Sequence, residues 1–141
     1  MTASTTASIT APIKVDICVI GAGSGGLTVA AGASQLGVSV ALVERDLMGG
    51  DCLNYGCVPS KALLAAGKAA HNIETAGRFG ISGGLLEVDT KAVRQHVRGV
   101  VAGIAPHDSV ERFQALGVNV IQGAACFKGR REIEVDGQTI T

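Results

Sequence analysis

The sequence predicts an α/β protein with a single domain. A buried strand and a glycine-rich turn open the chain after residue 14, apolar residues then recur at helical spacing between residues 51 and 116, and the pattern changes to alternation beyond residue 117. The composition agrees, because 47% of the 141 residues are hydrophobic, only 3% are aromatic and 20 are glycine. Such a chain builds its core from alanine and valine and uses glycine in tight turns.

The first elements form a βαβ unit. Residues 15–20 have the pattern of a strand buried on both faces, the turn GAGSGG follows, and a helix continues to Gly37. Residues 38–43 form a second buried strand that ends at Glu44. Because two buried strands joined by a helix are parallel, we expect a Rossmann-like parallel sheet with helices on both faces.

The rest of the pattern predicts two helical regions and a small sheet. One helix is expected from about Asp51 to Ile73, and a second region covers residues 93–116, with a bend or a new helix at Pro106. Three strands joined by tight turns, the last before a hairpin at Asp136-Gly137, would form a small C-terminal β-meander; they are residues 118–122, 124–128 and 132–135.

The leader and the charge narrow the class of protein. Residues 1–14 are rich in Ser and Thr and contain no apolar run long enough for a secretory signal or a membrane span, so we expect a disordered leader on a cytoplasmic protein. The formal net charge is zero, which argues against nucleic acid or a membrane as partners. In the cytoplasm the four cysteines are not expected to form structural disulfides.

The turn after the first strand carries the dinucleotide fingerprint G-x-G-x-x-G, between a strand and a helix. Gly21 permits the tight turn, Gly23 lets the backbone approach a pyrophosphate, and Gly26 lets the helix pack closely on the strand. The backbone N–H groups of Ser24, Gly25 and Gly26, at the positive end of the helix, would bind that pyrophosphate.

An acidic residue completes the fingerprint. Glu44 ends the second strand, where its carboxylate would accept hydrogen bonds from the ribose hydroxyls of adenosine. Three glycines at this spacing, together with an acid at the end of the next strand, seldom occur in a turn that binds nothing. The fingerprint predicts a dinucleotide and leaves FAD and NAD both open.

Two cysteines, Cys52 and Cys57, are separated by four residues in GGDCLNYGCVPSKALL. Zinc needs four ligands, usually in close pairs, and no second pair follows, so we predict no metal site. Two alternatives stay open: inert buried thiols, which fit poorly beside glycine, Asp and Asn, and a redox-active pair. In an ideal helix residues five apart rise about 7.5 Å, so a bridged pair requires a distorted helix, which Gly56 would permit.

The segment from residue 49 to residue 64 resembles the redox-active segment of the class I pyridine nucleotide-disulfide oxidoreductases, such as dihydrolipoamide dehydrogenase, glutathione reductase and mercuric reductase. The family pattern is G-G-T-C, four residues, then C-[IV]-P-S-K-A-L, after an FAD fingerprint that ends in Glu. The stretch IAPHDSVERF resembles a bacterial, mercuric-reductase-like branch. The resemblance covers essentially everything after the leader and implies that the dinucleotide is FAD.

The resemblance also implies roles for individual residues. Cys57 would lie against the flavin and take its electrons, and Cys52 would attack the substrate. Lys61 would lie near the flavin ring, where a cation stabilises the reduced form. Further cofactor contacts are implied for Gly49, Gly50, Asp51 and Ala125, the last at the adenine.

Two positions depart from the family pattern. Asp51 stands where the family has Thr, and its carboxylate would raise the pKa of Cys52, against the lowering expected near a helix N-terminus. Tyr55 replaces a small aliphatic residue, a change that we interpret as packing.

The function implied by the resemblance is electron transfer from NAD(P)H through FAD to a Cys52–Cys57 disulfide, and on to a small disulfide or metal-ion substrate. Residues 15–141 would be an incomplete FAD-binding domain that stops before its last strand, and the isolated chain would be inactive. NAD(P)H would bind a missing domain, and full-length members form homodimers through another. The alternatives are an NAD-dependent Rossmann dehydrogenase and a non-catalytic dinucleotide-binding fragment.

Overall fold

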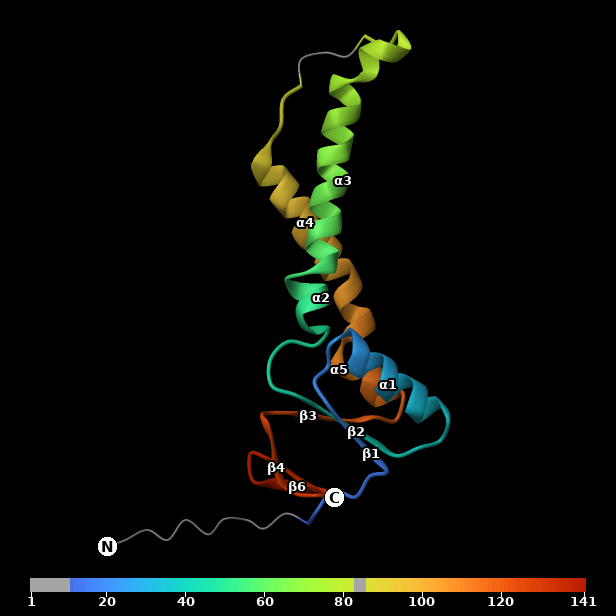
Figure 1. Cartoon of the computed structure of the whole chain (residues 1–141), viewed down its shortest axis with the longest axis vertical. Helices are drawn as coiled ribbons and strands as arrows, with labels where there is room; N and C mark the ends of the chain where they lie inside the picture. The colour runs from blue at the N-terminus through green and yellow to red at the C-terminus, as the bar shows by residue number, and fades with distance from the viewer. Residues whose placement is uncertain (1–10, 83–85) are drawn as a thin grey trace, which may run out of the picture.

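The computed structural model describes residues 11–82 and 86–141. It is elongated, with strands β1 to β6, α1 and α5 at one end and two long helices extending from them (Figure 1). We call the first part the sheet body and the pair α3 and α4 the helical arm. The elements in chain order are β1 (Ile17–Ile20), α1 (Ser24–Gln35), β2 (Val40–Glu44), α2 (Gly50–Asn54), α3 (Cys57–Glu74), the 3-10 turn η1 (Ala76–Phe79), α4 (Thr90–Ile104), the 3-10 turn η2 (Ala105–Asp108), α5 (Val110–Ala115), β3 (Asn119–Gln122), β4 (Ala125–Gly129), β5 (Glu132–Val135) and β6 (Gln138–Ile140).

Strands β1, β2 and β3 form a parallel sheet in that order. The central strand β2 is buried from Val40 to Val43, and its register with β1 begins at Ile17↔Val40. Parallel strands end at the same edge of a sheet, so the glycine turn after β1 lies beside Glu44, the last residue of β2. The predicted βαβ unit is confirmed.

The two faces of the parallel sheet are covered differently. Helices α1 and α5 cover one face, and the core there consists of Ala22, Leu27, Ala30, Val40, Leu42, Phe113 and Val118. The antiparallel sheet β4-β5-β6 covers the other face, where Val135 and Ile140 pack with Ala41 and Val43. The α/β class and a small C-terminal sheet are confirmed. The strand expected at residues 118–122 is β3 of the parallel sheet, and the third strand of the meander is β6, which was not predicted. The second face, where we expected helices, is covered by the meander instead, because β5 and β6 turn their own apolar residues toward it.

The C-terminal meander has the predicted hairpin. Asp136 and Gly137 join β5 to β6 with φ values of +47° and +85°, the left-handed pair that a tight hairpin requires. The register from Val135↔Gln138 to Ile133↔Ile140 follows from this two-residue turn.

The predicted disorder of residues 1–14 is wrong for the end of that segment. Ile13 pairs with Ile140, accepting a hydrogen bond from the Thr141 N–H (2.8 Å) and donating one to the Thr139 oxygen (2.9 Å). Its side chain also packs on the core of Val135 and Ile140. The pairing is with the other end of the chain, so no local pattern signals it. The expectation for residues 1–10 lies outside the described residues.

The helix through the cysteines is divided into two. We expected one distorted helix, whereas α2 ends at Asn54 and α3 begins at Cys57. Gly56 lies so close to α2 that a Cβ on it would come within 2.9 Å of the Asp51 oxygen. The glycine therefore matters for close approach at a complete break, and not only for bending a continuous helix.

We expected a bend or a new helix at Pro106, and a new helix does begin shortly after it. Helix α4 stops at Ile104, the turn η2 carries the proline, and α5 starts after Ser109, whose hydroxyl accepts a hydrogen bond from the Arg112 N–H (3.3 Å). This capping satisfies one of the backbone donors at the start of α5. The chain thereby returns from the helical arm to the sheet body.

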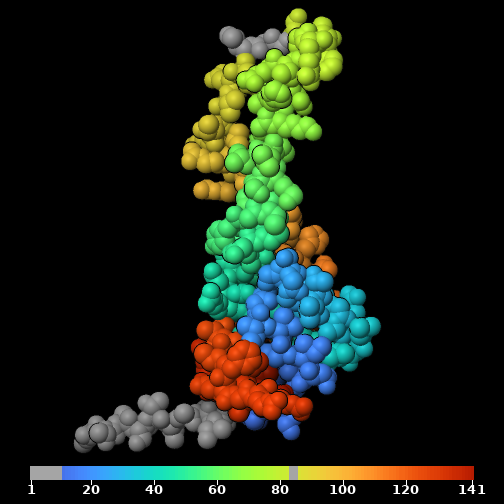
Figure 2. Space-filling model, in the orientation of Figure 1, coloured from blue at the N-terminus to red at the C-terminus, as the bar shows by residue number. Residues whose placement is uncertain are grey.

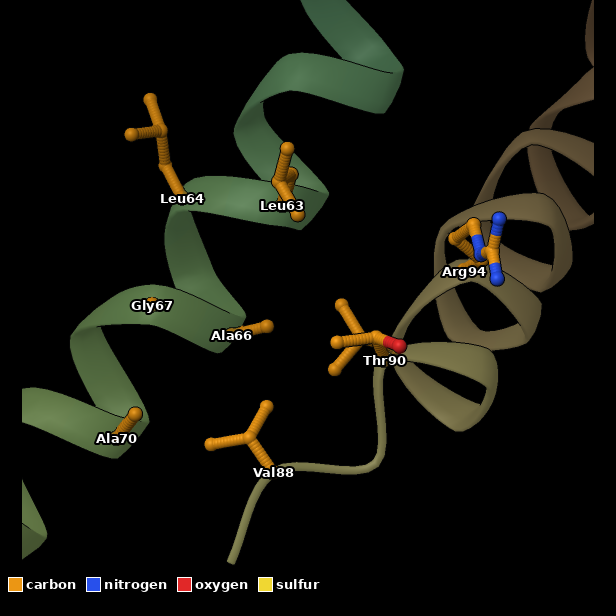
Figure 3. A pocket seen from close by; sticks show the side chains of 9 residues that line it. Leu63, Leu64, Ala66, Gly67, Ala70, Val88, Thr90 and Arg94 are labelled. Carbon is orange, nitrogen blue, oxygen red and sulfur yellow. The ribbon is translucent and has the colours of Figure 1, made fainter.

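A wide, open apolar hollow of about 700 Å³ lies along the helical arm. Its lining side chains come from α3, the beginning of α4 and the segment just before α4, among them Leu63, Thr90 and Val88 (Figure 3). None of the predicted site residues lies in it. Within residues 11–82 and 86–141, no helix combines the length and the apolar character needed to cross a membrane.

Candidate functional site

The glycine loop after β1 has the geometry of a dinucleotide cradle. Gly21 has a φ of +97° and donates its N–H to the Val43 oxygen (2.7 Å), which fixes the turn on β2. A Cβ on Gly26 would lie 1.8 Å from the Gly21 oxygen, so only glycine lets α1 approach the strand this closely. The first intrahelical bond runs from the Leu27 N–H to the Gly23 oxygen (2.9 Å). The three N–H groups that precede Leu27, those of Ser24, Gly25 and Gly26, are the predicted phosphate donors.

Glu44 is bonded to the glycine loop. Its carboxylate accepts hydrogen bonds from the N–H groups of Ala22 (2.5 Å) and Asp46 (2.8 Å). Each carboxylate oxygen has a further lone pair, so the same group can accept a ribose hydroxyl. The sequence predicted the position of this acid and missed its bond to the loop.

A pocket of about 200 Å³ brings together three of the predicted residues from distant parts of the chain. Gly21, Glu44 and Ala125 all line it. Gly123 and Ala124 also line it and were not predicted. Gly123 has a φ of +149° and donates its N–H to the backbone carbonyl oxygen of Glu44 (2.8 Å). A glycine directly after the third parallel strand was the available signal, because ligands bind at the carboxyl ends of such strands.

A second glycine turn lies against the first. Gly49 pairs with Gly23 and donates its N–H to the Ala22 oxygen (2.9 Å). A Cβ on Gly50 would lie 2.8 Å from the Gly23 Cα. Gly50 is also the first residue of α2, so the helix that carries Cys52 starts in backbone contact with the dinucleotide loop.

The two predicted cysteines lie side by side. The Sγ atoms of Cys52 and Cys57 are 2.6 Å apart, and both residues are free thiols. Cys52 lies within α2 and Cys57 is the first residue of α3, so the break at Gly56 is what brings the two sulfurs together. Cys52 is half-buried and Cys57 is exposed.

The two thiols differ in acidity. The hydrogen bond that Cys52 donates to Cys57 lowers the pKa of Cys57 and raises the pKa of Cys52. The Lys61 ammonium, one helical turn after Cys57, lowers the pKa of Cys57 further. Cys57 is therefore the more acidic thiol of the pair. The sequence left open whether Asp51 would raise the pKa of Cys52 or the helix N-terminus would lower it. The pKa is raised, and its largest cause is the hydrogen bond with Cys57.

Tyr55 does not pack inside the described part of the chain. Its side chain is 69% exposed and borders a shallow pocket together with Asp51 and Asn54. The interpretation of Tyr55 as a packing residue is therefore wrong for residues 11–82 and 86–141.

The comparisons with known proteins agree with this site. A family model described as pyridine nucleotide-disulphide oxidoreductase matches residues 15–141. The chain belongs to this family. It is 42% identical over 128 residues to a dihydrolipoyl dehydrogenase of Halobacterium salinarum, covering 87% of this chain and 26% of that protein.

Other members of the pyridine nucleotide-disulphide oxidoreductase family show similar identity. A dihydrolipoyl dehydrogenase of Thermus scotoductus is 40% identical over 131 residues, covering 88% of this chain and 26% of the relative. A mercuric reductase of Streptomyces lividans is 37% identical over 130 residues, covering 89% and 27%. The chain thus spans 26–27% of the length of these curated relatives. No cluster of three or more His, Cys, Asp or Glu side chains suited to a metal ion occurs in the described ranges.

Proposed function

We propose that this chain is the FAD-binding and disulfide-bearing part of a flavin-dependent reductase. Electrons would pass from NAD(P)H through FAD to Cys52 and Cys57, and from these thiols to a disulfide or metal-ion substrate. The observation that carries the proposal is the position of the pair. The two sulfurs are 2.6 Å apart at a helix that begins in backbone contact with the dinucleotide loop.

The residues present fit an FAD molecule. A Cβ on Gly21, Gly23 or Gly25 would meet no atom within 4 Å. The backbone of the loop is therefore open there, and a pyrophosphate needs such a surface. Glu44 would hold the ribose. Ser24 and Gly25 are proposed to contact the pyrophosphate, Lys61 the flavin and Ala125 the adenine. Gly49 and Asp51 are proposed as further contacts with the cofactor. Bound FAD would supply two-electron transfer between a nicotinamide and a disulfide.

The thiol pair can reduce a disulfide by two exchange steps. Cys52 passes its proton to the neighbouring Cys57 sulfur and attacks one substrate sulfur. A Cys52–substrate S–S bond forms, the substrate S–S bond breaks, and the leaving sulfur takes the proton from Cys57 and departs as a thiol. The Cys57 thiolate then attacks Cys52, closes the protein disulfide and releases the second substrate thiol. The lowered pKa of Cys57 favours this closing step, because the thiolate is the attacking form.

The names of the relatives suggest the substrate class. Dihydrolipoyl dehydrogenase and mercuric reductase are both among them, so a dithiol-disulfide compound and a metal ion are the two candidates.

NAD(P)H binding and homodimerisation are proposed for parts of the longer protein. The outer strands of the described parallel sheet are β1 and β3, and a further strand that pairs with β1 would complete the FAD domain. A reversible thiol pair suits the reducing cytoplasm, which we propose as the location.

Counting thiols tests this proposal against the two alternatives. In the oxidised chain under denaturing conditions we expect two reactive thiols, those of Cys18 and Cys126, and two more after reduction. Cys57→Ser should abolish that increase, and the matched control Cys126→Ser should retain it. Quenching of FAD fluorescence would measure cofactor binding, with Glu44→Gln weakening it. An unchanged thiol count together with binding of NAD in place of FAD would support a plain dehydrogenase and contradict the proposal.

A further inference from the structure

The turn between the dinucleotide loop and α2 is held on one side by backbone contacts alone. Gly49 and Gly50 both have left-handed φ values, +85° and +55°. Gly50 N–H donates to the Leu47 oxygen (3.1 Å), and Gly49 N–H donates to the Ala22 oxygen (2.9 Å). Glycine adopts the left-handed conformation without steric strain, but two successive glycines also leave the turn free to adopt other conformations. Something further must hold this turn in place.

One side chain bonds the turn from the other side. Asn54 Nδ2 donates hydrogen bonds to the Met48 oxygen (3.1 Å) and the Gly50 oxygen (2.8 Å), at a half-buried position. A primary amide carries two hydrogens on one nitrogen, so both are used. Within the described ranges, these are the only side-chain hydrogen bonds to the carbonyl groups of residues 47–50.

Asn54 also lies close to both cysteines in the sequence. It is the last residue of α2, two residues after Cys52 and three before Cys57. A helix of five residues does not hold itself together in water, so its direction is set by its anchors. Leu53 is buried and anchors its apolar side, and the Asn54 amide fixes its rotation about that anchor. The rotation of α2 determines where the Cys52 sulfur lies.

We propose that Asn54 is a positioning residue, which clamps α2 onto the turn that precedes it and so holds the Cys52 sulfur within bonding reach of Cys57. That turn is itself in backbone contact with the dinucleotide loop. This inference rests on the proposed function, in which the pair cycles between dithiol and disulfide. On closure one S–S bond forms, two S–H bonds are lost, and two electrons and two protons pass to an oxidant. Oxidised dithiothreitol serves as that oxidant in vitro.

The test is the equilibrium of the thiol pair with dithiothreitol in the whole 141-residue chain. Asn54→Leu removes both donors at similar size, and we expect the equilibrium constant for closing the disulfide to fall about tenfold, as loss of two hydrogen bonds to backbone carbonyls would cause. Asn54→Asp keeps the shape but points a carboxylate at two carbonyl oxygens, and should lower the constant at least as much. Asn54→Gln retains both donors and should restore most of the constant. The matched control is Asn72→Leu, on the exposed surface of α3.

A melting curve for each variant separates positioning from general stability. If Asn54→Leu and Asn54→Asp melt earlier but keep the wild-type equilibrium constant within about twofold, a difference too small for lost hydrogen bonds, the role is structural only and the inference is wrong. Should Asn54→Leu fail to fold, the same criterion applies to Asn54→Asp and Asn54→Gln. The measurement needs no FAD, so a wild-type chain that closes its disulfide but does not bind FAD contradicts the proposed function alone. A wild-type pair that never closes overturns both.

Discussion

The sheet body and the helical arm differ in how many of their side chains are buried. In the body, four consecutive residues of β2 are buried and the sheet is covered on both faces. In the arm, α4 has no buried residue and α3 has Ala62 alone among its described side chains. Figure 2 shows the compact body and the narrow arm. The thiol pair lies at the junction, where α2 leaves the body and α3 begins the arm.

This difference shows which part of the molecule determines the site. The glycine loop, Glu44 and Ala125 belong to the body, where buried contacts fix the backbone. Cys57 and Lys61 belong to the first turns of the arm, which contribute exposed side chains and little core. Substitutions that are equal in chemistry should therefore have unequal effects in the two parts.

The largest expected difference is between two glycine-to-alanine substitutions. Gly26→Ala puts a Cβ 1.8 Å from the Gly21 oxygen, so the backbone must move, at a cost of about 3 kcal/mol or more in unfolding free energy. Gly67→Ala, within α3, meets no atom within 4 Å and should stabilise that helix by roughly 0.5–1 kcal/mol. Chemical denaturation followed by circular dichroism measures both. Equal effects would show that the two regions do not differ as described.

A second pair of substitutions compares leucines. Leu42→Ala removes a fully buried side chain from the central strand and should lower the unfolding free energy by roughly 2–5 kcal/mol. Leu64→Ala removes a side chain that is 71% exposed on α3 and should change it by no more than about 0.5 kcal/mol. Urea titration of both variants gives the comparison. A large effect of Leu64→Ala would mean that the arm is covered in solution, for example by a second copy of the chain.

The smallest expected effect concerns the charge near the thiols. Lys61 lowers the pKa of Cys57, and only the thiolate is alkylated quickly. Lys61→Gln should therefore move the alkylation profile of Cys57 to higher pH, whereas Lys68→Gln, two turns farther along α3, should leave it unchanged. Peptide mapping after brief iodoacetamide treatment at a series of pH values follows Cys57 separately. A profile that both substitutions shift equally would assign the effect to overall charge.

Several parts of the site could be predicted because their cause is local. The spacing of Gly21, Gly23 and Gly26 predicted a close helix–strand contact, and the contact at Gly26 agrees. Pro106 predicted a bend or a new helix because it lacks an N–H and its ring obstructs the preceding turn, and α5 begins shortly after it. The glycine fingerprint and the cysteine segment at residues 49–64 also indicated the family whose model matches residues 15–141.

Other parts could not be predicted because they depend on residues far apart in the chain. Ile13 pairs with Ile140, Glu44 accepts a hydrogen bond from Ala22, and the meander takes the face where helices were expected. The two hydrogen bonds of Asn54 are local, but they also could not be predicted, since an asparagine near a helix end is common and its acceptors become neighbours only when the turn folds.

The sequence by itself determined the order of strands and helices, the glycine turns and the two cysteines, since hydrophobic period and glycine spacing act over a few residues. The tertiary structure decided that α2 and α3 separate at Gly56 and that the sulfurs of Cys52 and Cys57 meet across the break. The physical reason is that the Gly56 backbone lies so close to the Asp51 oxygen that a Cβ would not fit. This close approach exists only once both helices are in place.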